Sequence, residues 1–256
     1  MESDNGMRLP RLAVVTGART PQAKAFGALA RVSAVELSVH ATSAALARAG
    51  LSPDRVDEVV MGNVSGPADS ANIARVIALK SSVPYDRIAH TVNRNCASGM
   101  EAIIGGWLAI ATGRAQIVVA GGTESMSQVP MLVSEKTKAK LMAAGRAKSL
   151  FARLSAYAQL RASDLKPVFG IELGLTDPTC GLNMGQTAEI LADEFSITRD
   201  EQDAFALQSH LRAVAATESS FLSGEIAPVS VGGKEFKADV GPRAQQSLEQ
   251  LAKLKP

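Results

Sequence analysis

The feature that most constrains the fold of this chain is an alternation, through its first half, of short runs rich in Val and Ile with longer segments rich in Ala and Leu. The short runs predict four strands, at residues 12–16, 58–63, 89–95 and 116–121. The longer segments, at residues 33–49, 71–80 and 97–112, suit helices that cross from one strand to the next. This β-α-β-α-β-α-β order is typical of a parallel sheet covered by helices, so the predicted fold class is α/β.

Composition narrows the class of protein. The 256 residues are 46% apolar and 20% charged, with a formal net charge of +2, which is typical of a globular chain, and we expect no nucleic-acid partner. The sequence has no apolar run of transmembrane length, and residues 1–6 lack the basic and apolar regions of a signal peptide. We therefore expect a cytoplasmic protein. Cys96 and Cys180 are the only cysteines, too few for a disulfide framework or a thiolate metal site, so no metal is expected.

The alternation stops after Gly122, and residues 134–166 are helical in pattern and basic. Eight cations stand against two anions there, so the stretch carries a net charge of +6. Leu150, Leu154 and Tyr157 recur at helical spacing, which predicts an amphipathic basic helix. Such a helix is either a solvated face or a surface that docks on a membrane or on a partner.

A second helical pattern begins near residue 198. Thr198 and Glu201 have the spacing of a capping box, which predicts the start of a helix. An apolar stripe at helical spacing follows, and we expect it to lie in the core; its members are Ala204, Leu207, Leu211 and Val214.

The stretch with the most chemical information is Asn93-Arg94-Asn95-Cys96-Ala97-Ser98-Gly99, where a predicted strand runs into a predicted helix. The free N–H groups and the positive end of the helix dipole favour an anion at this junction, so the Cys96 thiol ionises more readily and can act as a nucleophile. A small buried cysteine at the start of a helix is the alternative. Gly99, Gly105 and Gly106 each lower helix propensity by about 1 kcal/mol relative to Ala. Their presence predicts close approach of another backbone or of a substrate.

These residues resemble the nucleophile motif of the thiolase family. Further segments similar to that family follow in the family's order, among them Gly17-Ala18-Arg19-Thr20-Pro21, Gly121-Gly122-Thr123-Glu124-Ser125, Asn183-Met184-Gly185-Gln186 and Ala252-Lys253-Leu254-Lys255-Pro256. The resemblance implies a thiolase N-terminal core half at residues 1–131 and an inserted helical loop domain over the CoA site at residues 132–256, with the C-terminal thiolase half absent. Residues 138–155 also resemble the insertion in the beta subunit of the fatty-acid-oxidation trifunctional complex.

The resemblance implies an acyltransferase that moves an acyl group from a 3-ketoacyl-CoA onto a cysteine and then onto CoA, in fatty-acid β-oxidation or in the reverse Claisen condensation. It implies that Cys96 accepts the acyl group and that Met184 and Arg243 contact the CoA substrate. A cysteine suits this exchange because its thioester is close in free energy to the CoA thioester. CoA thioesters are then substrates, and no bound cofactor is expected.

The sequence departs from the family in one respect. The family's Gly-His-Pro histidine and its second cysteine before a glycine run do not occur, and His40, His90 and His210 lack that context, so we interpret them as structural. Cys180 is interpreted as a loop thiol. The chain alone is therefore expected to be an incomplete catalyst, with a complementary C-terminal thiolase chain, a hydratase/dehydrogenase subunit and further copies of itself as candidate partners. Two alternatives remain, a noncatalytic acyl-CoA-binding or interaction subunit and a ketosynthase-like protein, which the residues after Cys96 disfavour.

Overall fold

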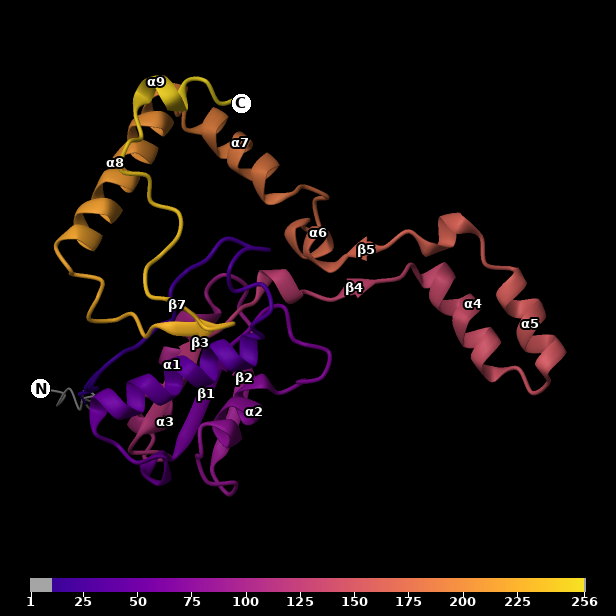
Figure 1. Ribbon diagram of the computed structural model, residues 1–256, viewed down its shortest axis with the longest axis horizontal. Helices are drawn as coiled ribbons and strands as arrows, with labels where there is room; N and C mark the ends of the chain where they lie inside the picture. The colour runs from indigo at the N-terminus through magenta and orange to yellow at the C-terminus, as the bar shows by residue number, and fades with distance from the viewer. Residues whose placement is uncertain (1–10, 256) are drawn as a thin grey trace, which may run out of the picture. The chain divides into compact units, whose positions relative to one another are not determined.

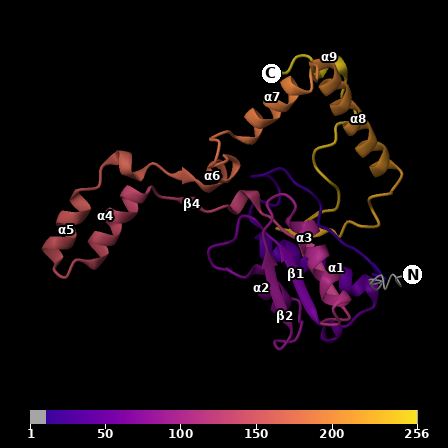
Figure 2. The ribbon, with the colours of Figure 1, turned by 180° about the vertical axis from the view of Figure 1, so that it is seen from behind.

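The computed structural model describes residues 11–255, apart from the side chains at 165, 169 and 172. Residues 1–6, on which the expectation about a signal peptide rests, lie outside this range. The described chain forms two compact units (Figure 1, Figure 2). One contains the residues up to 128 together with those from 198 onward, and the other contains residues 129–197. Residues 198–255 thus group with the first part of the chain, whereas the domain prediction joined them to the inserted segment.

A parallel sheet of three strands forms the centre of the first unit. The strands β1 (Glu58–Gly62), β2 (Ile88–Val92) and β3 (Val118–Gly122) lie in the order β2-β1-β3. The residue partners run in step, so that Gly62 lies opposite both Val92 and Gly122. All five residues of β1 are buried. Burial of a strand on both faces is typical of a parallel sheet. The predicted strands at residues 58–63, 89–95 and 116–121 are confirmed as β1, β2 and β3.

Three helices cover this sheet and match the three predicted crossovers. They are α1 (Ala34–Ala49), α2 (Ile73–Lys80) and α3 (Ser98–Ala111), and a short 3-10 helix, Pro53–Arg55, precedes β1. Helix α1 begins with a capping box between Ser33 and Glu36 and ends at Gly50. Gly50 has a φ of 63°, in the left-handed region that a residue with a Cβ adopts at a cost.

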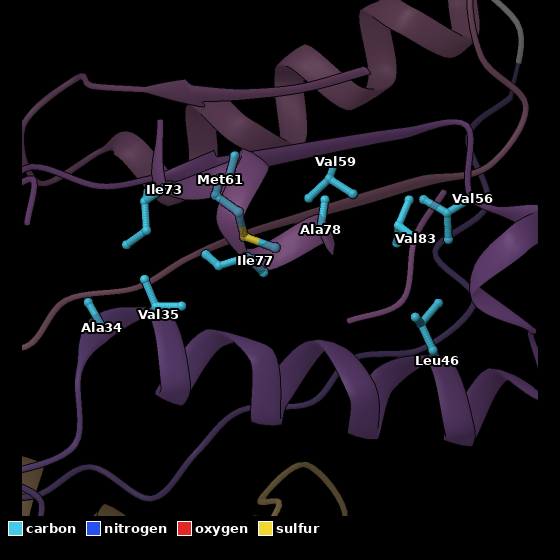
Figure 3. Close-up of a cluster of buried hydrophobic side chains, with 11 residues drawn as sticks. Ala34, Val35, Leu46, Val56, Val59, Met61, Ile73, Ile77, Ala78 and Val83 are labelled. Carbon is cyan, nitrogen blue, oxygen red and sulfur yellow. The ribbon is translucent and has the colours of Figure 1, made fainter. Parts of the chain in front are cut away.

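The main core lies between α1, α2 and one face of the sheet (Figure 3). Its side chains come from α1 (Val35, Leu46), from α2 (Ile73, Ile77, Ala78) and from β1 (Val59, Met61), and all are at most 6% exposed. Successive strand residues point to opposite faces, so Val60, which is fully buried, faces the other side. Helix α3 covers that side, because a Cβ added at its Gly105 would lie 3.7 Å from Cγ1 of Val60.

The prediction of a strand at residues 12–16 is wrong. Within residues 11–255 this segment belongs to no strand, and Val14 and Val15 are 81% and 71% exposed. Residues 12–18 instead form one wall of an apolar cavity of about 560 Å³, whose other walls are α1, α3 and β3. A Val-rich run reports a preference for extended backbone, but a strand also requires a neighbouring backbone at hydrogen-bonding distance, which composition does not specify.

The later part of this unit contains α8 (Arg199–Glu218), the hairpin of β6 (Val229–Val231) with β7 (Lys234–Phe236), and α9 (Leu248–Leu251). The capping box of Thr198 and Glu201 is confirmed at the start of α8. The expectation that the α8 stripe lies in the core is wrong, since no residue of α8 is buried and Leu211 is 49% exposed. Helical spacing identifies an apolar face, whereas burial needs an element packed against it, and in the described chain α9 packs on α8 at one end only.

The second unit, residues 129–197, is mostly helical. A two-stranded antiparallel pair, β4 (Met131–Leu132) with β5 (Val168–Phe169), brackets the helical hairpin of α4 (Glu135–Arg146) and α5 (Leu150–Ala158), and α6 (Gly170–Leu175) and α7 (Met184–Glu194) follow. A 3-10 helix lies at Ala162–Leu165, and another, Met126–Gln128, lies in the first unit just before this segment. The predicted amphipathic basic helix corresponds to α5. Among residues 11–255, none of the helices combines the length and the apolar character needed to cross a membrane.

Candidate active site around Cys96

Cys96 lies on the turn that joins β2 to α3. Strand β2 ends at Val92 and α3 begins at Ser98, and the Cys96 thiol is exposed. The prediction that this cysteine stands between a strand and a helix is confirmed, and the alternative of a buried cysteine is not. Loops that follow the carboxyl ends of parallel strands gather at one edge of the sheet, where α/β proteins commonly bind ligands.

The turn has an uncommon backbone conformation held by side chains. Asn95, next to the thiol, has a φ of 48°, and its N–H donates to Oδ1 of Asn93 at 3.0 Å. The hydroxyl of Ser98 accepts from the N–H of Arg94 at 2.8 Å and donates to the carbonyl of Asn95 at 2.7 Å. Ser98 is only 5% exposed. One buried hydroxyl therefore joins the two residues that precede Cys96.

Glycines at the strand ends allow the first turn of α3 to lie directly on the sheet. A Cβ added at Gly62 would lie 2.4 Å and 2.5 Å from the carbonyl carbon and oxygen of Ser98, whereas one added at Gly122 would lie 3.4 Å from Cα of Gly99. A Cβ on Gly99 itself would meet nothing within 4 Å, but one on Gly106 would lie 3.0 Å from Cγ1 of Val118. The expected close approach of another backbone therefore occurs, but the glycine that it requires is Gly62 in β1.

The loops after β1 and β3 are also joined. Nδ2 of Asn63 donates to the carbonyl of Thr123 at 2.8 Å, and the Glu124 carboxylate accepts from the backbone N–H groups of Val64 and Ser65. Thr123 in turn donates to the carbonyl of Ala34 at 2.7 Å. In the sequence, the Gly-Gly-Thr-Glu-Ser segment indicates only the family resemblance. Its polar residues prove to fix the loops at the edge of the sheet where Cys96 lies.

The other two predicted site residues lie on other segments of the chain. Met184 is half exposed at the first position of α7, where Asn183 and Gln186 form a capping box, and it belongs to the second unit. Arg243 lies in an exposed loop of the first unit, and its backbone N–H donates to Nδ1 of His210 at 3.2 Å.

The remaining thiol and histidines have separate surroundings. Cys180 is exposed in a loop built on Asp177, whose pKa is held below its usual range by hydrogen bonds from the hydroxyl and the backbone N–H of Thr179. Nδ1 of His90 lies 3.3 Å from the buried carboxylate of Glu58. Nε2 of His40 is buried and has no hydrogen-bond partner among the residues that the structure describes. In the described residues, His, Cys, Asp and Glu form no group of three or more that could hold a metal ion.

Comparisons with known proteins place this geometry in a family. A family model described as "Thiolase, N-terminal domain" matches residues 12–256. The chain is 35% identical over 248 residues to a 3-ketoacyl-CoA thiolase of Yersinia enterocolitica. The aligned region covers 96% of this chain and 56% of that relative. The chain is 36% identical over 248 residues to the human mitochondrial 3-ketoacyl-CoA thiolase, covering 95% of this chain and 58% of the human protein.

Solved structures agree with the sequence comparisons. The crystal structure of the Bacillus anthracis acetyl-CoA acetyltransferase has a TM-score of 0.81 at 35% identity, over 95% of this chain and 58% of that one. The crystal structure of human mitochondrial 3-ketoacyl-CoA thiolase in complex with CoA has a TM-score of 0.80 at 35% identity, over 94% of this chain and 57% of that one. The chain thus spans somewhat more than half the length of these proteins. The predicted α/β fold of the thiolase type is confirmed.

Proposed function

Because the chain belongs to the thiolase family through its N-terminal domain, we propose that it carries the acyl-accepting part of a thiolase, with Cys96 as the nucleophile. The observation that carries the proposal is the position of Cys96, an exposed thiol on a turn held by the buried hydroxyl of Ser98. The turn leads into α3, a helix of 14 residues, whose positive end favours the negative charge that develops on an attacked carbonyl oxygen.

The proposed reaction is acyl transfer between thiols. The Cys96 thiolate attacks the 3-keto carbon of a 3-ketoacyl-CoA, the bond between C2 and C3 breaks, and the released carbanion takes a proton to become acetyl-CoA. The thiol of a second CoA then attacks the thioester carbonyl carbon, the bond between that carbon and the Cys96 sulfur breaks, and the acyl group leaves as a new CoA thioester. The proton lost by the CoA thiol restores Cys96 as a free thiol. The reverse sequence is a Claisen condensation. Fatty-acid β-oxidation is the proposed degradative setting.

The carbon-carbon step needs a base as well as the nucleophile. The imidazole of His90 is directed to Glu58, and that of His210 accepts from the N–H of Arg243. We therefore assign the base and the donors for the enolate to a complementary C-terminal thiolase chain, which is one proposed partner. Met184 and Arg243 are proposed contacts for CoA, since a thioether adapts to an acyl or pantetheine chain and a guanidinium suits a phosphate.

Acetyl-CoA provides a direct test, because transfer of its acetyl group to Cys96 releases CoA and needs no carbon-carbon chemistry. Peptide mapping by mass spectrometry is expected to place the acetyl group on Cys96, to lose it in Cys96→Ala and to retain it in Cys180→Ala, which removes the other exposed thiol. Iodoacetamide is expected to label Cys96 faster than Cys180 and to be blocked by acyl-CoA. Binding of acetyl-CoA with no adduct would favour the noncatalytic acyl-CoA-binding subunit.

Turnover by the chain alone is expected to be weak. Loss of a general base typically costs about 10² to 10⁴ in rate, and loss of an oxyanion donor about 10² to 10³. Acetoacetyl-CoA with CoA should therefore yield acetyl-CoA below ordinary detection by chromatography. Robust formation that disappears in Cys96→Ala would show that the chain holds its own base.

Self-association and a cytoplasmic location complete the proposal. Large apolar side chains are exposed on α8, with Phe205 at 73% and Leu211 at 49%, and such side chains commonly mark interfaces. A homodimer is proposed first, and a hydratase/dehydrogenase subunit is a further partner. Light scattering that reports a monomer at high concentration would contradict self-association, and fractionation of cells tests the location.

A second function, docking on a membrane surface, is favoured by the α4–α5 hairpin. Leu150, Phe151 and Leu154 of α5 are 73%, 83% and 59% exposed, and they lie within the stretch at 134–166 that carries a net charge of +6. Exposed apolar side chains beside cations are the pattern of helices that lie on anionic lipid.

Vesicle sedimentation tests this second function. Vesicles that contain phosphatidylserine are expected to sediment the chain at low salt, and vesicles of phosphatidylcholine alone to sediment much less of it. Phe151→Ser should weaken binding, whereas Phe221→Ser, which changes a side chain that is 78% exposed in the other unit, should not. Docking through α5 would be contradicted if both kinds of vesicle sedimented the same amount of the chain. It would also be contradicted if Phe151→Ser and Phe221→Ser sedimented equally with the phosphatidylserine vesicles.

A further inference from the structure

The backbone around Cys96 is held from within the chain by Ser98. This side chain is bonded to the backbone of Arg94 and of Asn95, so it closes the turn on which the thiol sits. The left-handed conformation of Asn95 costs a residue with a side chain roughly 1–2 kcal/mol, which Asn reduces by local hydrogen bonds. A turn of this kind persists when surrounding contacts determine it, and the buried Ser98 hydroxyl is a central one of these contacts.

The height of α3 above the sheet is set by Gly62. This residue ends β1, and a Cβ there would lie within 2.5 Å of the carbonyl group of Ser98, a separation that Cβ atoms do not show. The partner in register, Gly122 of β3, leaves 3.4 Å to the same helix turn, which is ordinary contact. A side chain at position 122 can therefore be accommodated beside α3, whereas a side chain at position 62 cannot, even though both residues are glycine.

We propose that Ser98 and Gly62 are positioning residues for Cys96, Ser98 by closing the turn and Gly62 by letting the first turn of α3 lie on the end of β1. This inference rests on the proposed function, because the thiol that they position is the acyl acceptor. Acyl transfer needs a set direction of attack, and a displacement of about 1 Å can cost about 10²-fold in rate. Alkylation by a small freely diffusing reagent needs only an exposed thiol.

The test compares two rates at Cys96 in the same variants, acetylation by acetyl-CoA and alkylation by iodoacetamide, with alkylation of Cys180 as the reference within each molecule. Ser98→Ala is expected to lower acetylation about 10- to 100-fold and to leave alkylation within about twofold. Ser98→Thr keeps the hydroxyl and is expected to recover most of the acetylation rate. A residue that merely supported the fold would not separate the two reactions.

The two strand-end glycines supply a matched pair of variants. Gly62→Ala is expected to lower acetylation as Ser98→Ala does, and Gly122→Ala to leave it near the unchanged rate. Fluorescence of Trp107, the single tryptophan and a residue of α3, reports whether each variant is folded. If Gly62→Ala does not fold, Ser98→Ala with its Thr rescue decides the question.

The outcomes separate the two proposals. No acetylation of Cys96 in the unchanged chain would overturn the proposed function and this inference with it. Acetylation in the unchanged chain at a rate that folded Ser98→Ala and Gly62→Ala both retain would overturn the inference alone.

Discussion

Removal of Arg114 should destabilise the first unit through a single buried carboxylate. Glu58, the first residue of β1, is 1% exposed and accepts hydrogen bonds from Nε and Nη2 of Arg114 at 3.0 Å and 2.9 Å. In the variant Arg114→Met this carboxylate loses its bidentate partner and keeps the contact of 3.3 Å with Nδ1 of His90. Breaking a buried ion pair from one side typically costs about 3–5 kcal/mol. The Arg114 side chain is itself 51% exposed, so we expect a loss near the lower end, about 3 kcal/mol.

Urea unfolding followed by Trp107 fluorescence measures this loss in the right unit, since Trp107 lies in α3. A loss of about 3 kcal/mol corresponds to a fall in the urea midpoint of roughly 1–3 M. Arg31→Met, which removes an exposed arginine of the same unit, should change the free energy of unfolding by less than about 0.5 kcal/mol.

The double variant Glu58→Met/Arg114→Met distinguishes the cost of leaving a buried carboxylate unpaired from the cost of losing the side-chain contacts of Arg114. Replacing both members of a buried pair by apolar side chains is often neutral or stabilising, so it should be more stable than Arg114→Met alone. The reasoning would be refuted if Arg114→Met behaved like Arg31→Met, or if the double variant were no more stable than the single one.

Two further predictions concern the same unit. The pKa of Asp239 is held below its usual range by the hydrogen bonds that Arg19 donates, so its contribution to stability is present above the unfolded-state pKa and is lost as the pH falls through the folded-state value. Asp239→Asn should therefore be less stable at neutral pH and lose less stability on acidification, as measured by urea titrations at several pH values; parallel curves would contradict this. Gly50→Ala, at a φ of 63°, should lower the free energy of unfolding by about 1 kcal/mol, whereas Gly105→Ala, whose added Cβ would make ordinary contact with Val60, should raise it by up to about 1 kcal/mol. Equal effects in thermal unfolding would count against the backbone argument.

Local patterns in the sequence predicted the sheet well, because its signals are local. A Val-rich run and the helix after it together specify a strand and a crossover, and β1, β2 and β3 followed. In the described part of the chain, the segment at 12–16 has a similar composition but no partner strand, and the α8 stripe has helical spacing but no element packed over most of its length. In both cases the pattern reports a property of the segment itself. Strand pairing and helix burial, however, depend on whether another element packs beside the segment.

Contacts between distant residues could not be predicted from one sequence. Arg19 pairs with Glu225 and with Asp239, which lie 206 and 220 residues later in the sequence. These two ion pairs connect residues 198–255 to the first part of the chain. In the sequence, Arg19 stands out only as part of a segment that resembles the family, and no spacing rule connects it to its partners. The difference between the predicted and the observed grouping of the chain follows from such contacts.

The candidate site combines both kinds of information. The strand-turn-helix that carries Cys96 is local, so its residue types alone indicated a nucleophile. The position of the thiol, however, depends on Gly62, which lies 34 residues earlier and is brought to the site by the register of β1 beside β2. A chain with an intact Asn-Arg-Asn-Cys-Ala-Ser-Gly segment but with alanine at position 62 would still show the motif, yet its α3 could not occupy the same place, because the added Cβ would lie 2.4 Å from the Ser98 carbonyl carbon. The motif therefore identifies the proposed nucleophile, and the end of the neighbouring strand determines where the first turn of α3 can lie.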